Sequence, residues 1–183
     1  MSRIPELNPE SMSPKQKEVM QLITSGPHQR VIGPYPAWLH SPELAKRARD
    51  LSEYLRFQSA PSKRHAEIVI LVTGRHWKAE FEFYAHAELA RKAGVEEHII
   101  QALAAGKRPE FTNAEDSVVY ELSNELLTTR RISDATYQRA LDTFGMQTLV
   151  DLIAIVGYYC MVSTTLNAFE APLPAGEPSP FPD

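Results

Sequence analysis

Helix start and stop signals divide this 183-residue chain into segments of helical length. A serine followed by a proline is a typical helix start, because the serine caps the first turn and the proline suits its first position. Ser13-Pro14 and Ser41-Pro42 are such pairs, and glycines that suit helix ends stand at Gly94, Gly106 and Gly145. The pattern predicts an all-α fold, a bundle of about eight helices.

The sequence divides into one helical domain and a tail. Residues 1–170 are expected to form a single all-helical domain, whereas residues 171–183 contain five prolines and form a tail without a fold of its own. Gly33-Pro34-Tyr35-Pro36 predicts an irregular stretch with no regular helix. Helices are expected at residues 14–25, from 42 onward, from a cap at Ser62 to near Trp77, at 80–92 and 95–105, after Asn113, from 134 to 145 and at 146–167.

One apolar run conflicts with the helical pattern. Ile68-Val69-Ile70-Leu71-Val72 is rich in β-branched residues and would be a buried strand on propensity alone. The sequence has no second run of this kind to pair with it, and an isolated strand leaves its backbone N–H and C=O groups unsatisfied. We therefore expect this run to be helical.

Composition restricts the class of protein. The chain has 23 acidic and 19 basic residues and no dense basic patch, so we expect no nucleic-acid partner. The longest apolar run, residues 152–162, is shorter than the roughly 20 residues that a membrane span needs, and the first thirty residues have no apolar signal core. One cysteine, Cys160, excludes an internal disulfide and fits a reducing compartment. We expect a cytoplasmic protein with no membrane partner.

Segment 67–94 is largely apolar but contains four glutamates and two histidines, of which Glu67, Glu82, His76 and His86 are the candidates for chemistry. Glu82 and His86 are four residues apart, so their side chains can meet on one helix face. Such a pair can transfer protons because each group shifts the pKa of the other, but the same spacing is common in solvated ion pairs. Aromatic neighbours require one side of this helix to be buried, which favours the proton-transfer interpretation.

Glu67 and His76 are further candidates in this segment. Glu67 precedes five apolar residues, so it lies either at a water-facing helix edge or buried with a partner, and it reaches the Glu82–His86 pair only by packing between helices. His76 follows nine residues later, which on an unbroken helix is the opposite side. It reaches the same pocket only if the chain turns after Gly74.

Three other side chains are candidates for the wall of a substrate pocket: Trp77 beside His76, and Tyr35 and His40 in the proline-rich stretch. They can also simply fill gaps between helices. The pairing of two histidines four apart around a glutamate is absent, so we expect no metal and no cofactor. Cys160 lies in an apolar run, where a thiol tends to be inert.

The segment around the acid/base pair resembles the carboxymuconolactone decarboxylase family, which includes the alkylhydroperoxidase D-like proteins. The resemblance rests on Glu67-Ile68-Val69-Ile70-Leu71 and Glu80-Phe81-Glu82-Phe83-Tyr84-Ala85-His86, followed by Ala90 and Gly94-Val95, and on Leu39-His40-Ser41-Pro42-Glu43. It is good over about residues 33–105 and weaker up to 169. It implies an all-helical, alkylhydroperoxidase D-like fold and assembly as trimers or hexamers.

The same resemblance bears on the activity. The redox branch of the family carries a Cys-x-x-Cys motif shortly before its histidine; Ala79 and Glu82 stand at the matching positions, so dithiol peroxide reduction is excluded. The resemblance then implies a decarboxylase-type lyase of aromatic compound catabolism, in which a small carboxylated lactone or related acid loses carbon dioxide. His86 would be the proton donor, Glu82 would orient it, and Glu67 would support the pair.

Two other functions and one question of assembly remain open. The protein can be a non-catalytic family member that binds a small ligand, or a peroxidase-related protein that uses Cys160 alone. Residues 146–167 are apolar on more than one face. We therefore expect a homotrimer or homohexamer with Phe83 or Tyr84 near the contact; the alternative is a monomer whose own helices cover the last one.

Overall fold

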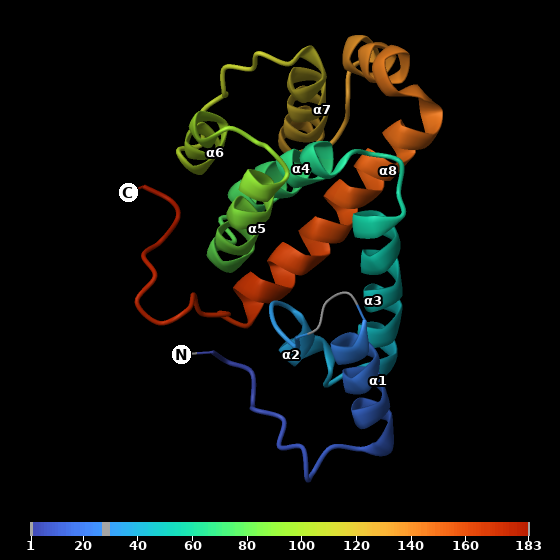
Figure 1. Ribbon diagram of the computed structural model, residues 1–183, viewed down its shortest axis with the longest axis vertical. Helices are drawn as coiled ribbons and strands as arrows, with labels where there is room; N and C mark the ends of the chain where they lie inside the picture. The colour runs from blue at the N-terminus through green and yellow to red at the C-terminus, as the bar shows by residue number, and fades with distance from the viewer. Residues whose placement is uncertain (1, 27–29, 183) are drawn as a thin grey trace.

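The computed structural model describes residues 2–26 and 30–182, and within these ranges the chain forms eight helices and no strand (Figure 1). This confirms the all-α fold. The helices are α1 (Pro14–Ser25), α2 (Tyr35–Trp38), α3 (Pro42–Phe57), α4 (Lys63–His76), α5 (Glu80–Lys92), α6 (Glu97–Ala104), α7 (Ala114–Thr129) and α8 (Asp134–Ala168).

Helix α4 lies at the centre of the bundle and packs against α5, α6, α7 and α8 (Figure 1). Ser62 caps its first turn by accepting a hydrogen bond from the His65 backbone N–H at 3.1 Å. The run from Ile68 to Leu71 is at most 1% exposed and is helical, as expected. A helix satisfies its own backbone groups, which a buried strand among helices would leave unpaired.

Helix α8 bends at Gly145, where φ is 74° and ψ is 169°. The predicted boundary between two helices is confirmed here: the backbone of Gly145 is not helical, and the two helical segments of α8 meet in a kink at this residue. By length and composition alone α8 is long enough and apolar enough to cross a membrane, although the apolar run 152–162 within it is shorter than a membrane span. However, 56% of its most apolar window is buried inside the molecule, as in a core helix. The exposed part includes Met146, Val150 and Ile153.

The proline-rich stretch contains a helical turn that the sequence interpretation excluded. Pro34 precedes α2 and Pro36 lies in its first turn, where a missing N–H leaves no helical hydrogen bond unmade. Trp38 at the end of this turn is 4% exposed and donates from Nε1 to Oγ1 of Thr165 on α8 at 3.1 Å. The turn therefore holds Tyr35, at its start, against the core.

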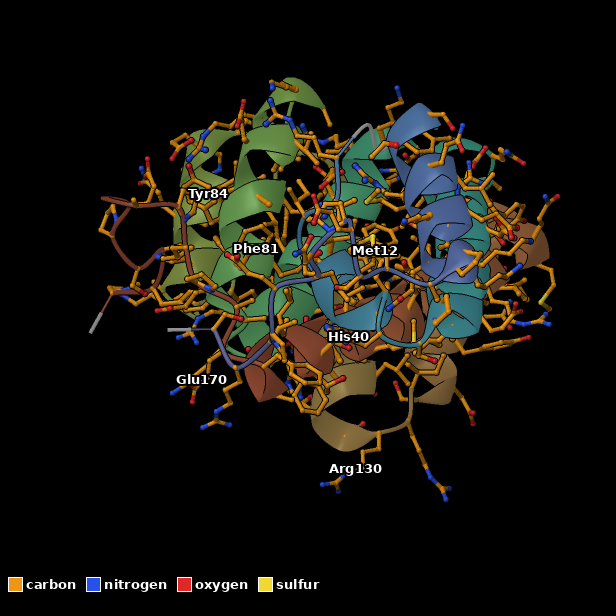
Figure 2. The ribbon with its side chains drawn as sticks, turned by 90° about the horizontal axis from the view of Figure 1, so that it is seen from below. Met12, His40, Phe81, Tyr84, Arg130 and Glu170 are labelled. Carbon is orange, nitrogen blue, oxygen red and sulfur yellow. The ribbon has the colours of Figure 1, made fainter. Side chains whose placement is uncertain are left out.

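The C-terminal tail has no helix but packs against α4 and α5. Phe181 of the tail makes two contacts. The centroid of its ring lies 5.1 Å from that of Phe83, and the Arg75 guanidinium lies 4.9 Å from the same centroid of Phe181. Tyr84 also lies on α5 (Figure 2), and burial together with the charges of Glu177 in the tail and Glu88 raises the pKa of its phenol. The tail of the same chain thus covers Phe83, which we had expected near a subunit contact.

Candidate active site

A buried acid/base pair joins α4 to α5. Packing of the two helices brings Nδ1 of His86 to 2.6 Å from Oε2 of Glu67. The two residues are 6% and 9% exposed. Glu67 is therefore buried with a partner and does not lie at a water-facing edge.

Glu82 lies on the other side of the same imidazole. Its Oε1 is 3.1 Å from Nε2 of His86, the contact that the four-residue spacing predicted. The oxygen lies off the direction of the ring N–H, so the pair is an ion pair without a directed hydrogen bond. This buried oxygen has no hydrogen-bond partner among the residues that the structure describes. A buried carboxylate oxygen without a directed hydrogen bond is costly even beside a cation, and a ligand or water that donates to it would lower that cost.

The two carboxylates determine the charge of His86. Burial by itself lowers the pKa of an imidazole, but the charges of Glu67 and Glu82 and their contacts with the ring outweigh it and raise the pKa of His86 to about 9. The ring therefore carries its second proton at neutral pH, and it is charged in a place where water has little access.

His86 and Glu82 open onto a cavity of about 350 Å³. Its size suits a small ring compound, because ligand pockets typically begin at around 300 Å³. Tyr159 of α8 packs edge-on against the imidazole, with ring centroids 5.1 Å apart and planes at 82°. The wall also includes two cationic side chains, Arg30 and Arg56.

A second cavity of about 230 Å³ lies on the Glu67 side. The two cavities share four wall residues: Arg56, Phe57, Leu89 and Tyr159. The second wall also includes two lysines, at positions 63 and 92. The acid/base cluster is thus reached from two sides, and cationic side chains line both.

Of the four residues expected in the substrate pocket, the structure brings only Tyr35 to the cavity of His86. Helix α4 continues unbroken through His76, so this histidine points to the other side and lines a separate cavity with Tyr120. Trp77 ends the helix and donates from Nε1 to Sγ of Cys160 at 3.2 Å. His40 is exposed at the surface (Figure 2), where its Nε2 lies 3.2 Å from the carbonyl oxygen of Pro5.

Sequence reasoning missed Arg56, Arg30 and the position of Tyr159. Tyr159 stood in the sequence as one more member of the apolar last helix, next to a second tyrosine, Tyr158, and nothing in the spacing distinguished the two. Arg56, in the last turn of α3, matched the cations that usually end helices. Its place at the cavity depends on how α3 packs, which helical spacing does not specify.

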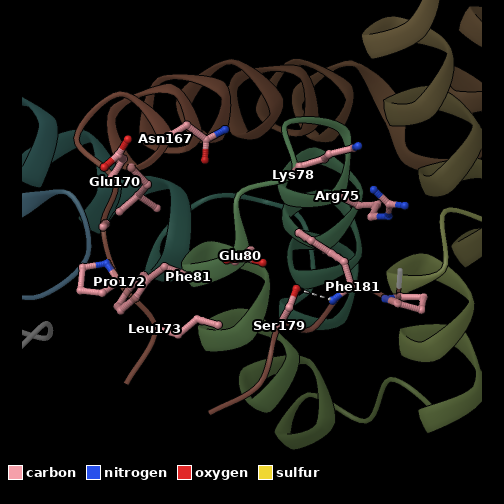
Figure 3. Close-up of a pocket in the computed structure, with 13 residues that line it drawn as sticks. Arg75, Lys78, Glu80, Phe81, Asn167, Glu170, Pro172, Leu173, Ser179 and Phe181 are labelled. Carbon is pink, nitrogen blue, oxygen red and sulfur yellow. Dashed lines mark hydrogen bonds between the residues drawn. The ribbon is translucent and has the colours of Figure 1, made fainter. Parts of the chain in front are cut away.

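A larger cavity of about 720 Å³ lies between the C-terminal tail and the helices (Figure 3). Arg75, Lys78 and Glu80 surround it together with Phe181 of the tail. It contains none of the acid/base cluster. Phe81 contributes to its wall and also to the wall of the His86 cavity, so this ring stands between the two.

Cys160 is half-buried, and burial raises the pKa of its thiol. Among the described residues, no group of three or more His, Cys, Asp or Glu side chains is arranged to hold a metal ion.

Comparison with known proteins gives the fold. No known family matches the sequence, and no curated protein matches it. Among solved structures, the chain is similar to an uncharacterized peroxidase-related protein from Silicibacter sp. TM1040, with a TM-score of 0.77 and 15% sequence identity. The match covers 95% of this chain and 92% of the other. The chain therefore shares the all-helical fold of that protein, at an identity that shows the fold alone.

Proposed function

We propose that this protein is an acid/base enzyme of the decarboxylase type, acting on a small carboxylated lactone or a related small acid. The observation that supports it most is the buried Glu67–His86–Glu82 cluster at the end of a 350 Å³ cavity. Buried titratable groups that perturb one another are typical of catalytic sites. A solvated ion pair on a helix surface, the other interpretation of the spacing, would be exposed.

The geometry suits His86 as a proton donor. Its Nδ1 is held by Glu67, whereas Nε2 faces Glu82 without a directed hydrogen bond. Glu67 is therefore the better candidate for the residue that orients the ring, a role that the sequence interpretation gave to Glu82. Because the pKa of His86 is raised to about 9, the ring is a charged acid at neutral pH.

In the proposed reaction, the bond between the carboxylate carbon and the substrate carbon breaks and carbon dioxide leaves. The bonding electron pair moves into the conjugated system and places negative charge on the carbonyl oxygen of the lactone. His86 then donates its proton to carbon, and the electron pair returns to form the C–H bond. The neutral imidazole regains a proton from water. No oxidant or second substrate is needed.

Charge in the cavities favours an acidic substrate. Arg56 and Arg30 line the His86 cavity, and Lys63 lines the neighbouring one together with Lys92, whose ammonium is paired with Glu88. A carboxylate that enters either cavity meets cations at its wall, which attract it and hold it near the imidazolium.

Turnover of a panel of carboxylated lactones tests the proposal. Carbon dioxide release and loss of substrate absorbance should be measured for the wild type, for His86→Gln and for the surface control His40→Gln. We expect turnover in the wild type and the control and a loss of about a hundredfold or more in His86→Gln. Equal rates in all three, or binding without turnover in the wild type, would contradict the proposal; the second result would favour a ligand-binding protein.

Peroxide consumption separates the remaining alternative. The single cysteine is half-buried, with the pKa of its thiol raised, so it is a poor nucleophile. We therefore expect peroxide consumption by the wild type and by Cys160→Ser to be the same. A rate of peroxide consumption that Cys160→Ser abolishes would instead favour a peroxidase that uses this cysteine.

A further inference from the structure

Tyr159 is buried, but its hydroxyl has no hydrogen-bond partner among the residues that the structure describes. The residue is 3% exposed and lines both cavities of the site. Its ring packs edge-on against His86, but its phenol makes no hydrogen bond to any residue that the structure describes. Buried tyrosine hydroxyls are usually hydrogen-bonded, so this donor is available to a molecule in the cavity.

The protonation state of the phenol makes it a donor. Burial and the nearby Glu67 and Glu82 raise its pKa well above the ordinary value, although the Arg56 charge acts in the opposite direction. The hydroxyl therefore keeps its proton at every pH at which the protein would work. It cannot act as a base there, but it can donate to an acceptor.

Arg56 is the second free group at this place. It lies in the wall that the two cavities share, and its guanidinium has no ion pair with a carboxylate among the described residues. It lies 5.3 Å from the centroid of the Phe57 ring, a stacking that leaves its N–H donors unused.

We propose that Tyr159 and Arg56 together bind the substrate oxygen that becomes negative when carbon dioxide leaves. This inference rests on the proposed function. His86, Tyr159 and Arg56 line one cavity, so a ring in it can meet the acid at a carbon atom and the two donors at an oxygen atom. Donors that are already in place when charge develops stabilise it strongly, because they need not reorganise.

A stable oxyanion probe tests this assignment without turnover. The probe is 4-nitrophenol, whose phenolate and neutral forms absorb differently; 4-nitrotoluene serves as an uncharged compound of similar shape. We expect the wild type to bind the phenolate in preference to the neutral forms. Tyr159→Phe and Arg56→Gln should each weaken phenolate binding by at least about tenfold, the size of a hydrogen bond to a charged group. Binding of 4-nitrotoluene should not change.

The matched controls are Tyr137→Phe, also on α8, and Arg47→Gln, on the exposed side of α3; both should bind the phenolate like the wild type. Tyr159→Phe should also keep the melting temperature, because no hydrogen bond within the protein is lost. A wild type without preference for the phenolate, unchanged phenolate binding in Tyr159→Phe, or a marked loss of its stability would overturn the assignment. Absence of lactone turnover with intact phenolate binding would overturn the proposed function alone.

Discussion

The charge of His86 predicts how the stability of this protein depends on pH. The pKa of the ring is about 6.5 in the unfolded chain and is raised to about 9 in the folded one, so the folded state binds the proton more tightly. This stabilisation is fully present below pH 6.5 and is lost as the pH rises through 9. A difference of about two and a half pKa units amounts to about 3 kcal/mol.

Urea unfolding between about pH 6 and pH 10 measures this effect. His86→Gln leaves two buried carboxylates without their cation, so we expect it to be less stable than the wild type at every pH. The comparison therefore uses the slope of the free energy of unfolding against pH, and not its absolute value. The free energy of unfolding of the wild type should fall relative to that of His86→Gln by about 3 kcal/mol over this range, with a steepest slope of about 1.4 kcal/mol per pH unit. His40→Gln, which removes a histidine outside the cluster, controls for the change in composition. Parallel curves for wild type and His86→Gln would refute the reasoning.

Three further predictions concern the reaction, the kink and the assembly. The rate of the proposed reaction should fall as the pH rises through about 9, and Glu67→Gln should move this limb to lower pH by removing one of the charges that raise the pKa of His86; an unmoved limb would assign it to another group. Gly145→Ala should lower the free energy of unfolding by about 1–3 kcal/mol in chemical denaturation, because its positive φ is strained for a residue with a side chain. No atom lies within 4 Å of an added Cβ, so the backbone conformation alone causes this loss. An unchanged denaturation midpoint would show that the kink relaxes without cost. We propose a homotrimer or homohexamer whose subunit contact includes the exposed residues Met146, Val150 and Ile153. Light scattering should therefore give a mass that is a multiple of 20.6 kDa, and Ile153→Asp should reduce this mass. A mass of 20.6 kDa for the wild type would contradict the proposal.

The helices were predictable because their signals are local. Each of the caps Ser13, Ser62 and Asn113 accepts a hydrogen bond from a backbone N–H two or three residues later. A sequence therefore shows both the cap and its donor in one short stretch. The short α2 was missed because Pro34 and Pro36 were taken only as helix breakers, whereas Pro14 and Pro42 were recognised as residues suited to the first turn of a helix.

The site was predictable only in part, for the corresponding reason. The Glu82–His86 contact follows from spacing on one helix, and the structure shows it. The contact of Glu67 with His86 requires a particular packing of α4 on α5. The position of Arg56 at the cavity likewise requires a particular packing of α3 against α8. Such packing depends on the fit of whole helix faces, which residue spacing in a single sequence does not specify.

The central position of α4 has a consequence for how the chain is made. Its run from Ile68 to Val72 is covered in the folded protein by α7 and α8, which follow only from Ala114 onward. During synthesis these residues leave the ribosome before their cover exists. The run has high β-propensity, no charge and no proline, which are the properties of segments that pair between chains. Aggregation of incomplete or slowly folding chains should therefore begin at the same residues that form the most buried helix of the finished protein.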